Sequence, residues 1–164
     1  PSTSGSPTDF TERAEYPQHD GSATQSFCFL YEERDMKQAL LQEKYPIFVA
    51  EIGKTETRFK TVDALVDYYK GKIAENPKVQ FIGIFDHYAH TAKIGGPIAE
   101  GMTAAVDIIF CFGFAIPTPQ MLAVRPRSIG IADMGDRFVI SFMEAPMQPA
   151  NQAMEAWTLA LRNA

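Results

Sequence analysis

Apolar residues recur with a helical period in two segments of this chain. In the first, residues 61–76, they fall at i, i+3, i+4, i+7 and i+11, which places them on one face of an α-helix. These apolar residues are Val62, Leu65, Val66, Tyr69 and Ile73. Thr61 suits the N-cap, because its hydroxyl can accept a hydrogen bond from a free backbone N–H. In residues 147–161 apolar positions step by three and four, which predicts a second amphipathic helix at the end of the sequence.

Shorter runs of apolar and β-branched residues, bounded by turn residues, predict the strands. We expect strands over residues 27–31, 47–52, 55–59, 79–85, 104–115, 127–132 and 137–143. Gly53-Lys54 suggests that the second and third of these strands form a hairpin, and Asp133-Met134-Gly135-Asp136 suggests the same for the last two. The strand over 79–85 is almost wholly apolar, so we interpret it as buried.

Residues 34–44 show a mixed pattern that we interpret as a helix, ended by Pro46 because its ring cannot continue the helical ladder. Thr118-Pro119, a hydroxyl followed by proline, predicts the start of another short helix. The strands follow one another without regular helical crossovers. We therefore predict an α+β two-layer sandwich, with a mainly antiparallel sheet of about five strands and two or three packed helices.

Residues 1–25 differ in composition from the remainder of the chain. They are rich in Ser, Thr, Pro, Gly and Asp and hold few large apolar groups, a composition that does not bury enough surface to order itself. We therefore divide the chain into an N-terminal tail, residues 1–25, and a single α+β domain, residues 26–164. We expect the tail to contact a second copy of the chain or another protein partner.

Composition excludes some classes of function. The 164 residues, with 46% hydrophobic content, suit one globular domain. The net charge of −5 gives no basic footprint for nucleic acid or an anionic membrane, and the longest apolar stretch is about half of the ~20 residues that a membrane helix needs. Cys28 and Cys111 lie in aromatic runs, so we expect reduced thiols in the core and a cytoplasmic protein.

The main candidate for chemistry lies in the long loop that we expect after the strand over 79–85. His87 and His90 lie three residues apart, and on a helical turn this spacing lets both imidazoles reach a common ion. Imidazole is a frequent ligand of divalent transition metals, so the pair is a candidate metal site. Such a site needs further ligands. The available residues, none at a diagnostic spacing, are Asp86, Glu100, Asp107, Cys28 and Cys111.

The same cluster also suits acid/base chemistry. Asp86 could orient His87, and Tyr88 could donate a hydrogen bond to a substrate oxygen. In an extended strand, however, Phe81 and Phe85 share a face with His87 while Asp86 points to the other face, so this dyad requires the backbone to turn at once. The plainest alternative is that one histidine packs under the rim of the sheet while the other faces water.

Arg125 and Arg127 flank Pro126 and are candidates for binding a ligand. Guanidinium groups bind carboxylates and phosphates well, and the helix start at Thr118 offers free N–H groups to an anion. The alternative is a pair of arginines that are solvated or paired with acidic groups. The glycine-rich residues 95–101 lack the spacing of a phosphate loop, so we interpret them as a connector that could cover the histidines.

The region from Phe59 to Met143, including the run Phe-Ile-Gly-Ile-Phe-Asp-His-Tyr-Ala-His-Thr, resembles an uncharacterised family of small bacterial α+β domains. The resemblance implies the fold class and a bacterial cytoplasmic setting, and it carries no assigned activity. We predict a small soluble binding domain with a ligand or metal pocket at Asp86–His90, present as a homo-oligomer or as a subunit of a complex. The alternative is an enzyme that uses His87, His90 and Tyr88 on a small anionic substrate.

Overall fold

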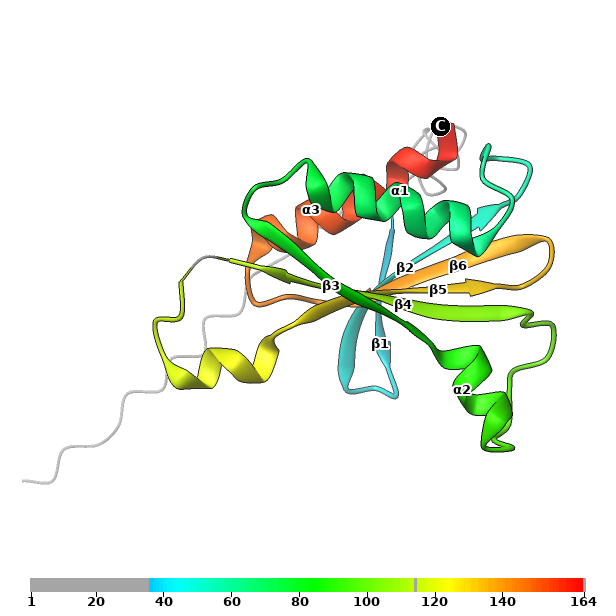
Figure 1. The fold of residues 1–164 in the computed structure, drawn as a ribbon, viewed down its shortest axis with the longest axis horizontal. Helices are drawn as coiled ribbons and strands as arrows, with labels where there is room; N and C mark the ends of the chain where they lie inside the picture. Colours follow the sequence, from blue (N-terminus) through cyan, green and yellow to red (C-terminus); the bar gives the residue numbers. More distant parts are fainter. Residues whose placement is uncertain (1–35, 114, 164) are drawn as a thin grey trace, which may run out of the picture.

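The computed structural model of the protein describes residues 36–113 and 115–163. These residues form a six-stranded antiparallel sheet in the order β1-β2-β6-β5-β4-β3, with two long helices against one face (Figure 1). The strands are β1 (Lys37–Leu41), β2 (Tyr45–Gly53), β3 (Val79–Asp86), β4 (Ala104–Phe112), β5 (Arg127–Asp133) and β6 (Arg137–Met143). The helices are α1 (Val62–Ala74), α2 (His87–Lys93) and α3 (Gln148–Leu159), with short 3-10 helices η2 (Pro119–Val124) and η3 (Ala160–Asn163). The predicted α+β class is confirmed, with six strands in place of about five.

The hydrophobic core lies between the sheet and the helices α1 and α3. Every second residue of the inner strands points toward these helices and is buried, as the period of two in a strand requires. These buried residues include Ala50, Ile52, Ile108, Phe110, Ile129, Ile131, Phe138 and Ile140. At the contact between the two helices, the hydroxyl oxygens of Tyr69 and Thr158 lie 2.8 Å apart and both residues are fully buried. The removal of this apolar surface from water is the main source of stability.

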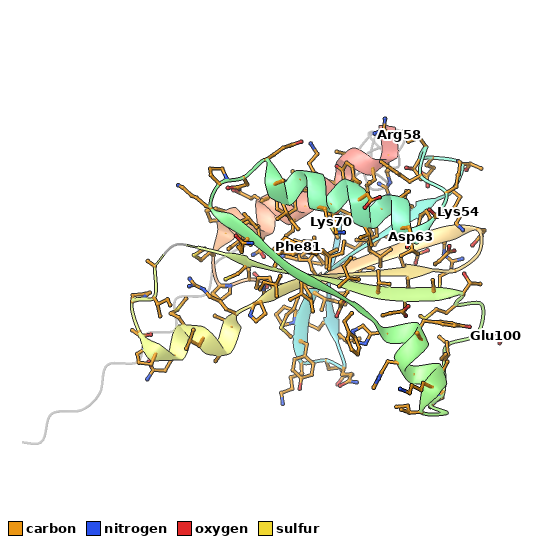
Figure 2. All side chains as sticks on the ribbon, in the orientation of Figure 1. Lys54, Arg58, Asp63, Lys70, Phe81 and Glu100 are labelled. Atoms are coloured by element: carbon orange, nitrogen blue, oxygen red, sulfur yellow. The ribbon has the colours of Figure 1, made fainter. Side chains whose placement is uncertain are left out.

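Both helices predicted from apolar periodicity are confirmed. The five apolar residues expected on one face of α1 are all buried, and the Thr61 hydroxyl accepts a hydrogen bond from the Ala64 N–H at 3.2 Å. The Lys70 ammonium lies 5.4 Å from the centre of the Phe81 ring, so α1 lies over β3 (Figure 2). At the C-terminal end of the sequence, α3 and η3 together cover the predicted C-terminal helix.

The helix predicted over residues 34–44 is wrong, because the structure has a strand there. Residues from Lys37 onward form β1, which pairs with β2 and places Leu40 opposite Pro46. Gln42 and Glu43 then reverse the chain with positive φ angles of 52° and 57°. The strand predicted over 27–31 and the tail over 1–25 lie outside the described residues. The local pattern of apolar residues suited a helix, but pairing with β2 supplies the backbone partners that decide the outcome.

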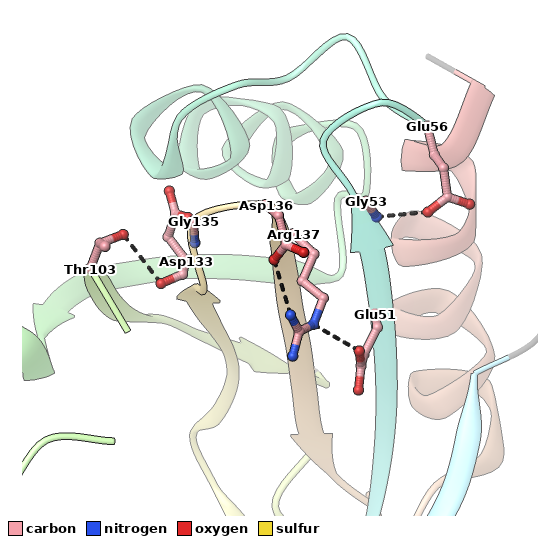
Figure 3. Close-up of polar contacts among 8 residues, drawn as sticks. All are labelled: Glu51, Gly53, Glu56, Thr103, Asp133, Gly135, Asp136 and Arg137. Carbon is pink, nitrogen blue, oxygen red and sulfur yellow. Dashed lines mark hydrogen bonds and ion pairs between the residues drawn. The ribbon is translucent and has the colours of Figure 1, made fainter. Parts of the chain in front are cut away.

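The strand predicted over residues 55–59 is also wrong. β2 pairs with β1 on one side and with β6 on the other, so neither of its edges is open to a returning strand. The chain instead runs through turns and bends toward α1, and the first turn is closed by the Gly53 N–H, which donates to the Glu56 carboxylate at 2.7 Å (Figure 3). The pairing of β2 with β6 could not be recognised from the local sequence, because the two strands are far apart along the chain.

The hairpin predicted from Asp133-Met134-Gly135-Asp136 is confirmed as β5 and β6. Within its turn the Gly135 N–H donates to the Asp133 carboxylate at 2.9 Å. Thr103, which precedes β4, donates from its hydroxyl to the Asp133 carbonyl at 3.3 Å (Figure 3). Arg137 binds the carboxylates of Glu51 on β2 and Asp136, at 2.9 and 3.0 Å. The short helix predicted after Thr118 is confirmed as η2, but the Thr118 side chain makes no capping hydrogen bond.

Three expectations about the histidine segment are wrong. β3 is an edge strand and is not buried, since Ile82 and Ile84 are 54% and 42% exposed. The histidines lie in α2, where a loop was expected. A register shift between Phe81 and Gly83 also reverses the alternation, so that Phe81 pairs with a core residue of β4 while Phe85 pairs with Asp107 on the opposite face. Phe81 and Phe85 therefore do not share a face.

The second face of the sheet, which we call the outer face, carries the residues that alternate with the core. They are half-buried and include small, apolar and polar types: Val49, Ala105, Asp107, Ile109, Gly130, Ala132, Val139 and Ser141. The long helices lie on the other face (Figure 1), and α2 extends from the end of β3 and packs against β4. Within the described residues, no helix combines the length and apolar character needed to cross a membrane.

Candidate functional site

The end of β3 positions the predicted site residues at the start of α2. The Asp86 carboxylate accepts a hydrogen bond from the Ala89 N–H at 2.8 Å, which caps α2 and turns the chain out of the strand. Asp86 is thus engaged in starting the helix. The dyad of Asp86 and His87 considered from the sequence does not occur, because the Asp86 side chain is directed toward the backbone of α2.

His87 instead pairs with Asp107, twenty residues further along the chain. Its Nε2 lies 2.9 Å from Asp107 Oδ2, and the two side chains are 50% and 28% exposed. Because an ionised carboxylate can only accept hydrogen bonds, the Nε2 proton of the imidazole faces Asp107. The antiparallel pairing of β3 with β4 creates this contact, since it sets Phe85 opposite Asp107 on the outer face.

The Phe85 ring lies between the pair and His90. Its centre is 4.6 Å from the His87 ring in an edge-on arrangement and 5.4 Å from the His90 ring. The spacing of three residues therefore does bring both imidazoles against one aromatic side chain, as one face of a helical turn predicts. Tyr88 is half-buried on the same helix, and within the described residues no hydrogen bond or ring contact joins it to His87 or Asp107.

A position without a side chain lies beside Asp107. Gly130 on β5 is its direct neighbour, and Ser141 on β6 is the neighbour of Gly130 on the far side. A side-chain carbon added at Gly130 would lie 3.1 Å from Asp107 Oδ1 and 3.7 Å from Ser141 Oγ. Asp107 therefore directs one carboxylate oxygen to His87, and the other lies against the position that a side chain at Gly130 would occupy. The sequence interpretation missed Gly130 and Ser141, although Asp107 within an apolar strand was a signal.

The metal interpretation gains no further ligands. Within residues 36–113 and 115–163, no three His, Cys, Asp or Glu side chains are grouped closely enough to hold a metal ion. Glu100 lies on the connector between α2 and β4 (Figure 2) and is exposed. Cys111 is a free thiol, half-buried on the outer face opposite Gln80 and not in the core, and Cys28 lies outside the described residues. One imidazole and one carboxylate remain, which is fewer than a closed site requires.

Arg125 and Arg127 lie away from the histidines and bind backbone carbonyls. Arg125 Nη1 donates to the Ala115 carbonyl at 2.9 Å, and Arg127 donates to the carbonyls of Val124, at 3.5 Å, and Met143. Burial lowers the pKa of the Arg127 guanidinium, because the charged form is less well solvated. These contacts hold the segment before β5 in place.

The register of the sheet explains why Arg127 lies away from the His87–Asp107 pair. Arg127 is opposite Phe110, which lies three residues from Asp107 along β4. Three residues span roughly 10 Å and reverse the face of the strand, so Arg127 and Asp107 lie on opposite faces of the sheet. A single ligand of ordinary metabolite size therefore does not contact both the arginines and the His87–Asp107 pair.

Comparisons with known proteins identify a family whose function is unknown. No curated protein and no solved structure matches the chain. A family model, described as a family of unknown function (DUF6858), matches residues 36–163. The match spans well over half of the chain, and it includes β1 to β6 and the helices between them. The chain therefore belongs to this family of unknown function, DUF6858.

Proposed function

We propose that this protein is a non-enzymatic binding domain that holds a small molecule at the His87–Asp107 pair. The observation that carries the proposal is the 2.9 Å contact between His87 Nε2 and Asp107 Oδ2 on the outer face. Asp107 is 28% exposed, and the glycine at position 130 puts no side chain from β5 over its second carboxylate oxygen. We include a bacterial cytoplasmic setting in the proposal, on the basis of the family resemblance alone.

The chemistry of the site favours a ligand that donates hydrogen bonds. Asp107 Oδ1 and the Ser141 hydroxyl both lie near Gly130, and an ionised carboxylate can only accept hydrogen bonds. An ammonium group supplies several donors and a positive charge, which also suits the negative net charge of the chain. Phe85 and Ile109 border the site with apolar surface for the carbon part of such a ligand. Benzylammonium combines both features and is a suitable probe.

The test is a titration of the full chain with benzylammonium, followed by two-dimensional amide NMR. We expect concentration-dependent shifts at Phe85, His87, Gly130 and Ser141. Asp107→Asn keeps the shape of the side chain and removes its charge, and it should weaken binding at least about tenfold, since hydrogen bonds to charged groups contribute ~1.5–3 kcal/mol. Equal affinity in wild type and in Asp107→Asn would rule out this site.

Two controls make the titration specific. Asp67→Asn removes a carboxylate of the same kind from the exposed side of α1, on the other layer of the domain, and should leave the affinity unchanged. Benzoate has the same ring and the opposite charge, and it should not shift the amides near Asp107. Stronger shifts with benzoate than with benzylammonium would contradict the proposed ligand chemistry.

One observation favours the alternative function, acid/base catalysis by His87. A carboxylate that holds an imidazole in a fixed tautomer is a common arrangement in hydrolytic sites. An anionic substrate now has less support, because Arg125 and Arg127 bind backbone carbonyls elsewhere. Turnover of 4-nitrophenyl acetate tests this alternative. Hydrolysis that is lost in His87→Ala would favour an enzyme, whereas equal rates in both proteins would favour the binding domain.

Association with a second copy or another protein is also part of the proposal. Large apolar side chains are exposed on both edge strands, including Leu40 and Leu41 on β1 and Ile82 and Ile84 on β3. Exposed apolar groups gathered on strand edges are a frequent feature of association surfaces. The predicted role of residues 1–25 in this contact is tested by light scattering of a chain that lacks them. An unchanged mass would remove that role.

A further inference from the structure

Arg127, at the start of β5, carries a guanidinium whose hydrogen bonds are incomplete. Of its five N–H groups, two donate to the backbone carbonyls of Val124 and Met143. Its Nε is buried and has no acceptor within the described residues. None of the ion pairs in this part of the chain involves Arg127, and burial lowers the pKa of its guanidinium because the charged form is less well solvated. A half-buried guanidinium without a countercharge is stabilised by an anion that binds beside it.

A hollow lies beside this guanidinium, between the end of η2, the start of β5 and the end of β6. η2 leads into β5 at one end of the sheet (Figure 1). The hollow has a volume of about 390 Å³, which is within the usual range for small-molecule sites. Arg127 and Glu144 line it together with mainly apolar residues, among them Val124, Met143 and Pro146. All of its lining residues fall within 123–146, in the described part of the chain.

A second, smaller hollow adjoins the first and is largely apolar. Val124, Arg127 and Pro146 line both hollows, and Phe112 and Met121 are among the other residues around the smaller one. Its volume of about 20 Å³ holds a group of about the size of one water molecule. An aliphatic chain in the larger hollow can therefore place one methyl group in the smaller one, where apolar surface is removed from water.

Glu144 brings a negative charge to the larger hollow. Its side chain is exposed, and among the described residues it has no ion pair, although Arg127 lines the same space. Glu144 would repel a simple carboxylate bound at Arg127, whereas both charges attract a ligand that carries a carboxylate and an ammonium group. A free amino acid carries these two groups on one carbon atom.

We propose that this hollow binds a free amino acid with an aliphatic side chain. Its carboxylate accepts hydrogen bonds from N–H groups of Arg127 that the backbone carbonyls leave free, and its ammonium group faces Glu144. The aliphatic side chain lies against Val124, Met143 and Pro146. This site is separate from the His87–Asp107 pair, and the inference does not depend on ligand binding there.

The experiment is a titration of the full chain with leucine, followed by amide NMR at low ionic strength, where exposed charges are least screened. We expect concentration-dependent shifts at Ala123, Val124, Glu144 and Ala145. 3-Methylbutylammonium is leucine without its carboxylate, and its dissociation constant should be at least about tenfold higher, because it offers the guanidinium no anion. A change in the ligand is preferable to a change of Arg127, since this residue also holds two backbone carbonyls.

The contact with Glu144 is tested by changing the ligand and the protein together. 4-Methylpentanoate is leucine without its ammonium group, and it should bind about threefold more weakly, a small factor because Glu144 is exposed. Glu144→Gln keeps the shape of the side chain and removes its charge, so this variant should bind the two ligands about equally. Glu100→Gln removes an exposed charge from the connector between α2 and β4, and as the matched control it should keep the threefold difference.

Several results would overturn the proposal. The absence of shifts at these four amides up to about 50 mM leucine excludes binding in this hollow. Equal dissociation constants for leucine and 3-methylbutylammonium exclude the contact between the carboxylate and Arg127. A threefold difference that persists in Glu144→Gln excludes the contact with the ammonium group. Shifts confined to Phe85 and His87 place leucine at the His87–Asp107 pair and not in this hollow.

Discussion

The cap of α2 controls how firmly His87 is held beside Asp107, and Asp86→Ala tests this. The substitution removes the acceptor of the Ala89 N–H, which now bonds the carboxylate at 2.8 Å. α2 has seven residues and none of them is buried, so its packing against β4 compensates little for a lost cap. Isolated helices of this length are unstable in water, and α2 therefore depends on its cap and on the contact with Asp107.

The size of the effect follows from these contacts. Replacement of an N-cap aspartate by alanine costs about 1 kcal/mol, and the loss of a negative charge at the positive end of the helix adds ~0.3–1 kcal/mol. Together they correspond to roughly a tenfold or greater rise in the population of molecules in which α2 is open. The global free energy of unfolding should fall by a similar amount, because α2 is also open in the unfolded chain.

Hydrogen–deuterium exchange of peptides that cover residues 86–94 measures the local opening, and urea unfolding measures the global change. Asp86→Ala should speed exchange in α2 about tenfold. Asp86→Asn keeps an oxygen acceptor in the same position and should lose only the smaller contribution of the charge. Unchanged exchange in Asp86→Ala, or an equal effect of both substitutions, would refute the reasoning.

Three further predictions concern the buried polar groups between the layers. Thr158 donates to the Met154 carbonyl at 2.8 Å, so the Tyr69 hydroxyl is left to donate to Thr158. In urea unfolding, Thr158→Val should then lower the free energy of unfolding by ~2 kcal/mol and Tyr69→Phe should lower it by about 1 kcal/mol. The double variant should lose less than the sum of the two, because it leaves no buried polar group unpaired. Additive losses would contradict this assignment of donor and acceptor. Burial raises the pKa of Tyr69 far above its ordinary value of 10.0, so this phenol ionises at a lower pH in the unfolded chain than in the folded one. Stability should therefore fall as the pH rises above 10. If the melting temperature of Tyr69→Phe fell equally steeply with pH above 10, that would be evidence against this explanation. The buried Asn151 side chain accepts a hydrogen bond from the Ala145 N–H at 2.7 Å and donates one to the Ala145 carbonyl at 3.0 Å. Asn151→Ala should lower the free energy of unfolding by roughly 2–4 kcal/mol in the same assay. A loss below about 1 kcal/mol would mean that water replaces these hydrogen bonds.

Elements with a strong local signal could be predicted from the sequence. The apolar positions of α1 recur over several turns and Thr61 supplies the cap, so the helix forms where the pattern places it. The β5–β6 hairpin has alternating strands and a turn rich in Asp and Gly, which makes its closure a local event. The antiparallel sheet followed from the absence of helical crossovers between the strands.

Elements whose state depends on distant partners could not be predicted in this way. The segment at 37–41 is compatible with a helix by its local pattern, and it becomes a strand because β2 offers backbone partners. The expected return strand at 55–59 is absent because β6, more than eighty residues further on, already occupies that side of β2. The buried appearance of β3 is also misleading, since its apolar side chains lie at an edge of the sheet.

The candidate site shows the same division. The sequence alone determined that His87 and His90 follow a strand and that a helical turn would place both imidazoles on one side, because spacing is a local property. Only the structure showed that these residues form a helix and not the expected loop. Tertiary structure decided that Asp86 caps the helix while Asp107 holds His87, because the register of β3 on β4 and the shift after Phe81 choose which residues meet. Pairing across a sheet depends on the whole set of strands, and for that reason it is not encoded in the spacing of any one segment.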